Sequence, residues 1–459
     1  MKQKFLLLII IASLVGFLGN FIGLSLRQSV IISVFSMSVL GTFFFWDFRI
    51  SFVFIGSGIL FLINAMNMEF FIQYASIDVI LFLIGMMIIV AMLKEAGFFM
   101  WIITSLLRIK ALDGQRLFVM IMLLSFIFAG LMDEVSSILI MMQVVFIICE
   151  FLAISPIPLI ISSIIATNIG SASTVLGNPI GILIAARAGL TFEDFITHAL
   201  PVSFIILIIT IIILMVFYKD YIAEMSKKLY PHEHDAGFLH LISVPPDRKT
   251  VGSIILFTMV LLSIAMHGRM ERLLNLEENT LLIIIPVIFA GIVLIYRRDK
   301  AIYYVEHEVE WNSLLFFMFL FAQAGVIRAQ GIGIFIAEKL IKIVGTNEKL
   351  LSGIVLGSTG VLSSVLDNVV VVASYVPVVR GLNNTFNTKP LWWALLFGAC
   401  YGGNITMIGS TANIVALGLL GKRTGEKITF LNWLKIGLIV GLVSMLIALV
   451  SINISSAFK

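Results

Sequence analysis

Unbroken apolar runs of about 16–22 residues recur along this chain of 459 residues. About 20 apolar residues in a helix cross the ~30 Å hydrocarbon layer of a bilayer, whereas a transmembrane barrel would show alternating strands of about 10 residues. The pattern therefore predicts an all-α polytopic membrane protein. The expected helical segments are 5–26, 29–46, 51–66, 77–93, 117–132, 135–152, 157–186, 200–217, 251–267, 280–296, 313–328, 350–366, 369–379, 391–420 and 432–452, with amphipathic stretches at 98–110 and 331–345.

Composition narrows the class of protein further. Hydrophobic residues make up 60% of the chain and charged residues 12%, about half the charge density of a soluble globular domain. So few charges cannot cover a water-facing surface, which excludes a soluble enzyme, and so apolar a chain is not disordered. Cys149 and Cys400 lie in apolar surroundings and allow no disulfide framework. Lysines and arginines in the loops of such a protein set its orientation, so we expect no nucleic-acid partner and no cofactor.

The two halves of the chain read as copies of each other. A shift of 234 residues aligns 81–137 with 315–371 and places Asp133 on Asp367. A shift of 232 places Gly170, Thr174 and Gly177 on Gly402, Thr406 and Gly409, and a shift of 238 places Thr191-Phe192 on Thr429-Phe430. Each copy holds five spans and one paired segment, an odd count, so the copies should be inverted, as in secondary transporters. We expect about 11 transmembrane helices, two re-entrant hairpins and two broken helices at the midplane.

The repeat also predicts the domain organisation. The expected parts are a first span at 1–26, repeat 1 at 27–217 (scaffold 27–110, transport unit 111–217), a cytoplasmic loop at 218–250, and repeat 2 at 251–459 (scaffold 251–345, transport unit 346–459). With the N-terminus inside, most of the 30 lysines and arginines fall in cytoplasmic segments. The positive-inside rule then places the C-terminus outside, and we expect a prokaryotic cytoplasmic membrane. Histidines and acids in 218–250, such as His232 and Glu233, leave a metal site in that loop open, although a solvated loop explains them as well.

Three acidic residues lie deep within apolar sequence: Asp133, Glu134 and Asp367. A carboxylate buried in hydrocarbon is costly, so such residues usually face a cavity and handle ions or protons. The alternative is a loop between ordinary helices with its acids in surface water. Acidic pairs at matching repeat positions favour the functional interpretation. Adjacent carboxylates also resist double ionisation, so we expect Asp133 and Glu134 to carry a coupled proton.

Two apolar runs are interrupted by glycine, asparagine and proline, near Asn178-Pro179 and near Gly402-Gly403-Asn404. Glycine breaks a helix and proline suits the first turn of a restarted one. Broken backbone is tolerated at depth only around a cavity, although close packing by small residues is the other interpretation. The expected substrate- or ion-binding residues are Asp133, Glu134, Ser136, Ser137, Asn168, Ser171, Thr174, Gly177, Asn178, Asp367, Asn368, Asn404, Thr406, Gly409, Ser410 and Asn413.

These motifs, together with Leu81-Phe82 and Ala188-Gly189-Leu190-Thr191-Phe192, resemble the ion-transporter superfamily over nearly all of 77–452. The resemblance is greatest to the branch of arsenite-efflux permeases and NhaD-type (ArsB/NhaD) sodium/proton antiporters, which includes the melanosomal P protein and is distantly related to sodium/dicarboxylate symporters. It implies scaffold helices, a mobile unit that moves as an elevator, and a homodimer. The branch usually has Asp-Asn in both hairpins, and Glu134 departs from that pattern.

We therefore expect a secondary active transporter in the lipid bilayer that exchanges protons for sodium or another monovalent cation. Oxygen atoms of the kind that hard cations favour make a sodium-type site possible at Asp367, Asn368, Thr406, Gly409 and Asn413. The alternatives are arsenite or antimonite efflux, a sodium-coupled carboxylate symporter and an ion channel. An intramembrane aspartyl protease would need Gly-x-Gly-Asp, but Asp133 follows Gly130-Leu-Met and Asp367 follows Ser364-Val-Leu. We expect no enzyme.

Overall fold

The computed structural model describes residues 2–45, 48–99, 101–102, 113–229, 248–277, 279–345, 347–383, 385–454 and 458. Within these ranges every regular element is a helix, so the expected all-α fold class is confirmed. Nine helical segments are long and apolar enough to cross a membrane, and five shorter apolar helices of 10–17 residues accompany them among the described residues. The run 157–186 is interrupted as expected, and it forms two of the shorter helices, Ile157–Ser171 and Pro179–Ala188.

The chain divides into two compact units. Unit 1 comprises Met1–Ile80, Glu310–Gly403 and Ala448–Lys459, and unit 2 comprises Leu81–Val309 and Asn404–Ile447. Each unit takes segments from both halves of the sequence, and the expected scaffold and transport boundaries stay a prediction. Helices α5 (Ile77–Glu95) and α24 (Phe430–Ile454) run from one unit into the other.

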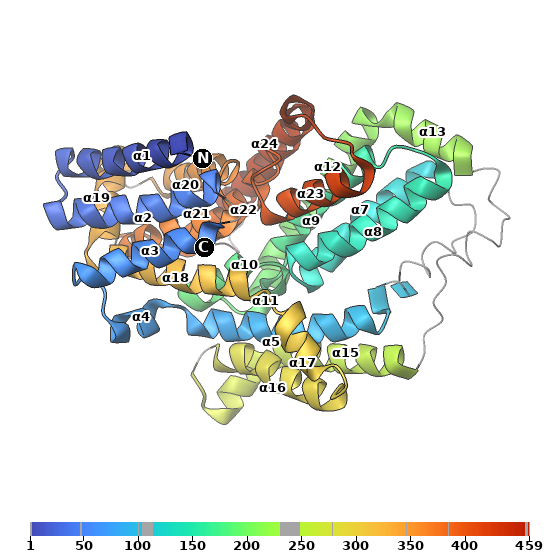
Figure 1. The fold of residues 1–459 in the computed structure, drawn as a ribbon, viewed down its shortest axis with the longest axis horizontal. Coiled ribbons are helices and arrows are strands. Elements are labelled where there is room, and N and C mark those ends of the chain that lie inside the picture. The colour runs from blue at the N-terminus through green and yellow to red at the C-terminus, as the bar shows by residue number, and fades with distance from the viewer. Residues whose placement is uncertain are drawn as a thin grey trace. The chain divides into compact units, whose positions relative to one another are not determined.

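Unit 1 begins with helices that lie side by side (Figure 1). They are α1 (Lys2–Phe21), α2 (Leu26–Phe44) and α3 (Arg49–Leu62), followed by the short α4 (Met68–Tyr74). A Ser25/Gln28 capping box starts α2, in which each side chain accepts a backbone amide of the other residue. A Cβ on Gly16 would lie 2.0 Å from the Ser33 hydroxyl oxygen, so glycine allows α1 to approach α2 closely.

The rest of unit 1 contains the second predicted hairpin. Its helices are α18 (Trp311–Ala329), α19 (Ile332–Val344), α20 (Glu348–Ser363), α21 (Asn368–Gly381) and α22 (Lys389–Gly402). With 16 and 14 residues, α20 and α21 are shorter than the about 20 residues of a full span, as a re-entrant hairpin requires. A Cβ on Gly402 would lie 2.3 Å from the Gly360 carbonyl oxygen, so α22 packs tightly on α20.

Unit 2 is built around three packed helices, of which the first two, α7 (Gly114–Leu131) and α8 (Glu134–Leu152), lie side by side in Figure 1. The third is α9 (Ile157–Ser171), continued by a 3-10 turn (Val175–Gly177), α10 (Pro179–Ala188), α11 (Phe192–Asp194), a π turn (Phe195–Ala199), α12 (Leu200–Phe217) and α13 (Lys219–Leu229). By length and composition, α7 and α8 could each cross a membrane. The re-entrant nature of this first pair stays a prediction.

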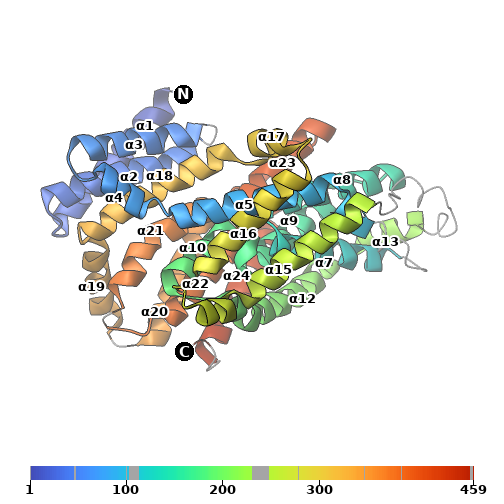
Figure 2. The ribbon, with the colours of Figure 1, turned by 90° about the horizontal axis from the view of Figure 1, so that it is seen from below.

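A second group of helices in unit 2 contains α5, α15 (Arg248–Leu274) and α16 (Thr280–Tyr296), which run alongside one another in Figure 2. A Cβ on Gly85 would lie 2.6 Å from the Pro286 carbonyl carbon, so α5 and α16 are in close contact. At their ends, Arg297 donates to Glu95 at 2.6 Å. A short α17 (Ala301–Tyr303), a π turn (Tyr304–Glu308) and α23 (Thr411–Thr424) complete the unit.

Two expected segments fall largely outside the described residues. The amphipathic stretch 98–110 is described only at 98–99 and 101–102, and residues 230–247 of the loop, with its histidines, are not described. The first part of the loop is helical rather than irregular, because α13 covers Lys219–Leu229. Its buried Ile222, Met225 and Leu229 recur at helical spacing and pack toward α7.

Candidate ion-binding site

The first hairpin turns at two acidic residues, as the sequence predicts. Asp133 is the N-cap of α8, and its carboxylate accepts from the amides of Val135 at 3.0 Å and Ser136 at 2.8 Å. Such a cap is favourable because the first amides of a helix lack partners within the helix. Glu134 follows in the first turn and is only 4% exposed. Of the two acids, the buried one is therefore Glu134, while Asp133 is half-buried and holds the helix end.

At the break in the first broken helix, hydrogen bonds of Asn178, which precedes Pro179, hold the loop together. Asn178 caps α10 through its side-chain oxygen, which accepts from the Gly181 amide at 2.7 Å. Its side-chain nitrogen donates to the carbonyl oxygen of Ser171, seven residues back, at 3.0 Å. The loop is tied to the first hairpin because Thr174 donates to the Gly130 carbonyl. These bonds partly replace the backbone bonds that the broken helix loses.

The loop at the break in the second broken helix is held by the same type of asparagine hydrogen bond. The side-chain nitrogen of Asn413 donates to the carbonyl oxygen of Thr406, again seven residues back, at 3.0 Å. Ser410 caps α23 by accepting the Ala412 amide at 3.1 Å. The carbonyl of Asn404 accepts from the indole nitrogen of Trp433 on α24 at 3.0 Å. The residues between Thr406 and Asn413 are thereby fixed as a closed loop at the start of α23.

Asn168, near the end of α9, joins these parts of unit 2. Its side-chain nitrogen donates to the side-chain oxygens of Asn404 at 2.8 Å and Asn413 at 2.9 Å. Its side-chain oxygen accepts from the Ser410 hydroxyl at 3.1 Å, and the same hydroxyl lies 3.3 Å from the Glu134 carboxylate. We call these five residues the polar cluster: Glu134, Asn168, Asn404, Ser410 and Asn413.

The polar cluster is shielded from the surroundings and carries one ionisable group. All five side chains are at most 4% exposed. Glu134 supplies the only titratable side chain of the cluster, and the other members supply amide and hydroxyl groups. The Asn404 side-chain nitrogen is buried without a hydrogen-bond partner among the described residues. A buried donor of this kind is costly unless another group satisfies it, so the cluster has a free hydrogen-bond donor.

The second hairpin, in unit 1, turns at Asp367. This residue caps α21 by accepting the Val369 amide at 3.0 Å and is 5% exposed. Burial disfavours the charged guanidinium of Arg49, at the start of α3, and the negative charge of Asp367 acts in the opposite direction. Arg49 also donates to the Ser313 hydroxyl at 2.8 Å, and that hydroxyl donates to Glu310 at 3.0 Å. The expected hairpin acid therefore lies in a charged network that includes a positive group.

Arg49 is the functional candidate that the sequence analysis missed. In the sequence alone, a single arginine between the predicted spans 29–46 and 51–66 resembles any loop charge that sets orientation. The sequence feature that could have indicated a role for Arg49 is its position as a lone charge between two apolar runs. Its position follows from α18, which contacts both α3 and α21. Sequence spacing does not reveal that a helix 262 residues later carries Ser313 toward Arg49.

Local geometry supports the equivalence of the two halves. Asp133 and Asp367 each accept the amide two residues ahead. Thr174 and Thr406 do the same with Leu176 and Ile408, and the helix caps Asn178 and Ser410 also differ by 232 residues. Thr191 and Thr429 each accept the amide three residues ahead. Matching caps at the three predicted shifts are more specific than matches among apolar residues.

The expected site residues therefore fall into three groups. The polar cluster brings together Glu134, Asn168, Asn404, Ser410 and Asn413, and Ser171, Thr174, Gly177, Asn178 and Thr406 shape the two broken-helix loops around it. Asp133 caps a helix, Ser136 is half-buried, and the Ser137 hydroxyl donates to the Ser125 carbonyl at 3.5 Å. Asp367 and Asn368 belong to unit 1, whereas Thr406, Gly409 and Asn413 belong to unit 2, so the joint sodium-type site stays a prediction.

Comparison with known proteins identifies the family. The sequence model of the CitMHS family, described as citrate transporter, matches residues 43–395 and 325–457. An uncharacterized transporter of Mycobacterium tuberculosis is 30% identical over 380 residues, which cover 81% of this chain and 85% of the relative. The human P protein is 26% identical over 80% of this chain and 52% of its own length.

A solved structure shares the fold. The YdaH transporter of Alcanivorax borkumensis superposes with a TM-score of 0.51 at 14% identity, covering 87% of this chain and 88% of that chain. The likeness concerns the fold alone at this level of identity. The family model and the mycobacterial relative match most of the length of this chain. The helical spans and the broken helices around the buried polar cluster agree with that match. The chain therefore belongs to the CitMHS family of secondary transporters.

Proposed function

We propose that this transporter exchanges protons for sodium or another monovalent cation and that the polar cluster of unit 2 is where the proton and the cation compete. The observation that carries the proposal is the burial of Glu134 beside the Ser410 hydroxyl, at 3.3 Å. A carboxylate within a membrane protein is costly unless it serves a proton or an ion. An entering cation favours the charged form of Glu134 and so releases the proton.

The chemistry of the polar cluster suits a small cation. One carboxylate and the oxygens of Asn168, Asn404, Asn413 and Ser410 are ligands of the type that hard cations prefer. The broken helices add carbonyl groups at the same place, such as those of Ser171 and Thr406. The side-chain oxygens of Asn404 and Asn413 accept from Asn168, so a bound cation would compete with the Asn168 side chain for these oxygens.

The manner of movement and the assembly are further parts of the proposal. The resemblance to the arsenite-efflux and NhaD-type branch favours an elevator movement of the hairpins and broken helices within a homodimer. The second hairpin, where Asp367 acts electrostatically on Arg49, then supplies fixed charges. Glu134 in the first hairpin is the titrating group.

Transport of a carboxylate is the second candidate, and two observations favour it. The matching family model is described as citrate transporter. In addition, the buried Asn404 side-chain nitrogen, without a partner among the described residues, could donate to a carboxylate oxygen. Against it stands Glu134 in the same cluster, which would repel a polyanion while it is ionised.

Uptake of radioactive sodium into proteoliposomes separates these functions. With an acidic interior, outward proton movement should drive sodium accumulation, and Glu134→Gln should abolish it. A matched control is Glu150→Gln on the same helix, because Glu150 is exposed and pairs with Arg423 at 2.9 Å. Citrate and arsenite are added as competitors. Proton-driven uptake of labelled citrate without sodium exchange would overturn the cation proposal, and the same result with arsenite would point to metalloid efflux.

A further inference from the structure

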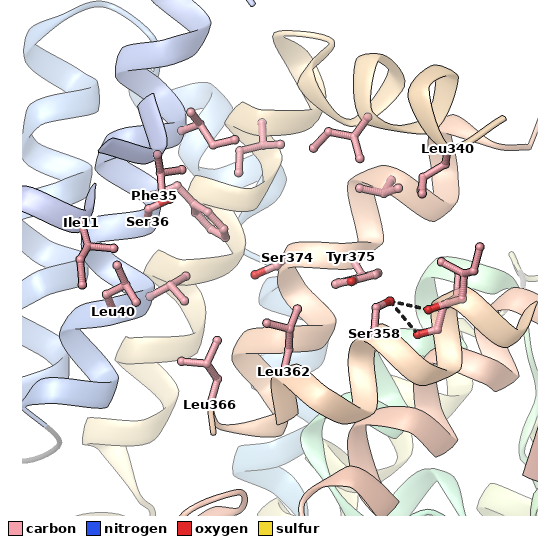
Figure 3. A pocket seen from close by; sticks show the side chains of 18 residues that line it. Ile11, Phe35, Ser36, Leu40, Leu340, Ser358, Leu362, Leu366, Ser374 and Tyr375 are labelled. Carbon is pink, nitrogen blue, oxygen red and sulfur yellow. Dashed lines mark hydrogen bonds between the residues drawn. The ribbon is translucent and has the colours of Figure 1, made fainter. Parts of the chain in front are cut away.

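Unit 1 contains a pocket that the proposed transport reaction does not use. Its volume is about 490 Å³, which lies in the range of small-molecule pockets. Figure 3 shows Ile11, Phe35 and Leu40 of α1 and α2 on one side and Leu362 and Leu366 at the α20–α21 turn on another. Helices α18 and α19 supply the remaining wall, including Leu340.

The lining excludes an ionic or strongly polar occupant. Fourteen of the 18 lining side chains are aliphatic or phenyl, and the other four are Ser36, Ser358, Ser374 and Tyr375. No charged side chain lines this pocket. An ion or a lipid headgroup placed here would lose its hydration without compensation, whereas a hydrocarbon group would gain free energy from the buried apolar area.

Two of the three serine hydroxyl groups that line the pocket are already engaged. Ser358 donates to the Ile354 carbonyl at 2.5 Å, and Ser374 donates to the Val370 carbonyl at 2.7 Å. Because these two hydroxyls bond to carbonyl oxygens of their own helices, they do not call for a hydrogen-bonding ligand. This part of the pocket wall is therefore mainly apolar.

Hydrocarbon is available next to the pocket. Helix α1 is a candidate membrane span, and its outer face exposes Leu14 at 52%, Phe17 at 68% and Leu18 at 50%. Side chains of this size are exposed at such fractions in a spanning helix because lipid chains cover them. Ile11 and Val15 on the same helix line the pocket and are half-buried. The α1 surface therefore leads from the lipid-facing side into the pocket.

We propose that this pocket holds one acyl chain of a membrane lipid, inserted between α1–α2 and the α20–α21 hairpin. Leu366 lines the pocket and immediately precedes Asp367, the cap of α21. The acyl chain supports the hairpin from the side of Leu362 and Leu366, and an empty pocket would leave about 490 Å³ without packing partners. The bound lipid is thus a structural part of unit 1.

Lipid retention and photolabelling test this proposal without reference to transport. Purified protein is reconstituted in nanodiscs of phosphatidylcholine that contain a lipid with a diazirine group in its acyl chain. Labelled peptides are then mapped by mass spectrometry. We expect labelling of 354–378 to persist after the protein is moved into lipid-free detergent, where labelling of the exposed α1 face is lost. Native mass spectrometry should show one retained lipid per chain.

Two pocket-filling variants provide the decisive comparison. Ser374→Phe fills the lumen from α21 and Ser36→Phe fills it from α2, so a folding defect in one leaves the other to test. Each should lower lipid retention about tenfold, which corresponds to about 1.4 kcal/mol. Leu14→Phe, on the exposed face of α1, is the matched control and should retain the lipid. Wild-type retention in both filled variants would overturn the proposal, and so would a change of oligomeric state in place of lipid loss, because a second copy would then be the occupant.

Discussion

The Ser410 hydroxyl lies 3.3 Å from the Glu134 carboxylate, although 276 residues separate them in the sequence. Ser410 also donates to Asn168, so the cap of α23, the tip of the first hairpin and the end of α9 meet in one polar cluster. Buried networks of this kind specify a geometry because each lost partner leaves another group unsatisfied. The contact therefore links the titratable group to both broken helices.

Replacing Glu134 by Asn should uncouple sodium movement from protons, so that sodium-for-sodium exchange continues but loses its pH dependence. The substitution removes the titratable group of the polar cluster but keeps an oxygen that can face Ser410. Transport is measured against pH in wild type and Glu134→Asn, with Glu150→Gln as the control on the same helix. Superimposable pH profiles for wild type and Glu134→Asn would show that Glu134 carries no coupled proton.

Asn168→Leu should lower the thermal stability of the protein. The change removes both donors to Asn404 and Asn413 and the acceptor for Ser410, and each unsatisfied buried group costs about 1–3 kcal/mol. Thr167→Val is the matched control, because the neighbouring Thr167 hydroxyl is buried without a partner among the described residues. Its loss should be nearly neutral. Equal melting temperatures for the two variants would argue against a cooperative cluster.

Gly177→Ala should distort the first broken helix. A Cβ at this position would lie 2.3 Å from the Ser171 carbonyl oxygen and 2.8 Å from that of Ala129, both of which are backbone atoms. We expect a loss of about 1–3 kcal/mol, as for other overpacked sites, together with reduced transport. Gly291→Ala is the control, since nothing lies within 4 Å of its added Cβ. A variant at Gly177 that melts and transports like wild type would contradict the tight loop.

Arg49→Gln should impair transport more than Arg116→Gln, whose side chain is 60% exposed. In unit 1, burial disfavours the charged guanidinium of Arg49, and the negative charges of Asp367 and Glu310 counteract this effect, so removing one of these charges leaves the others less compensated. Asp367→Asn alone should abolish coupled transport while the protein still assembles. The double variant with Arg49→Gln should be less impaired than the sum of the single effects. Strictly additive losses of transport rate would show that the two residues act independently.

Sequence patterns predicted the features that arise from local chemistry. The breaks at Asn178-Pro179 and before Thr411 follow from helix-breaking and capping residues, and the caps at Asp133 and Asp367 occupy equivalent repeat positions. Apolar runs likewise predicted the all-α class. Such signals are encoded within a few residues, so they can be recognised without knowledge of the tertiary fold.

Features that depend on packing between distant segments were not predicted. Nothing in the local sequence distinguishes Asn168, which bonds Asn404 and Asn413, from Ser136, whose amide donates to Asp133. The surroundings of Arg49 depend on the contacts of α18 with α3 and α21, and the apolar pocket of unit 1 depends on where α1 and α2 face α19, α20 and α21.

Proton movement driven by a sodium gradient tests the central claim most directly. Proteoliposomes with a pH-sensitive dye inside receive external sodium at equal pH on both sides. Wild type and Glu150→Gln should make the interior alkaline as protons leave, and Glu134→Gln should not, because Glu134 is the titratable group of the polar cluster. A pH change of equal size in Glu134→Gln, or no pH change in wild type with any monovalent cation, would contradict the account.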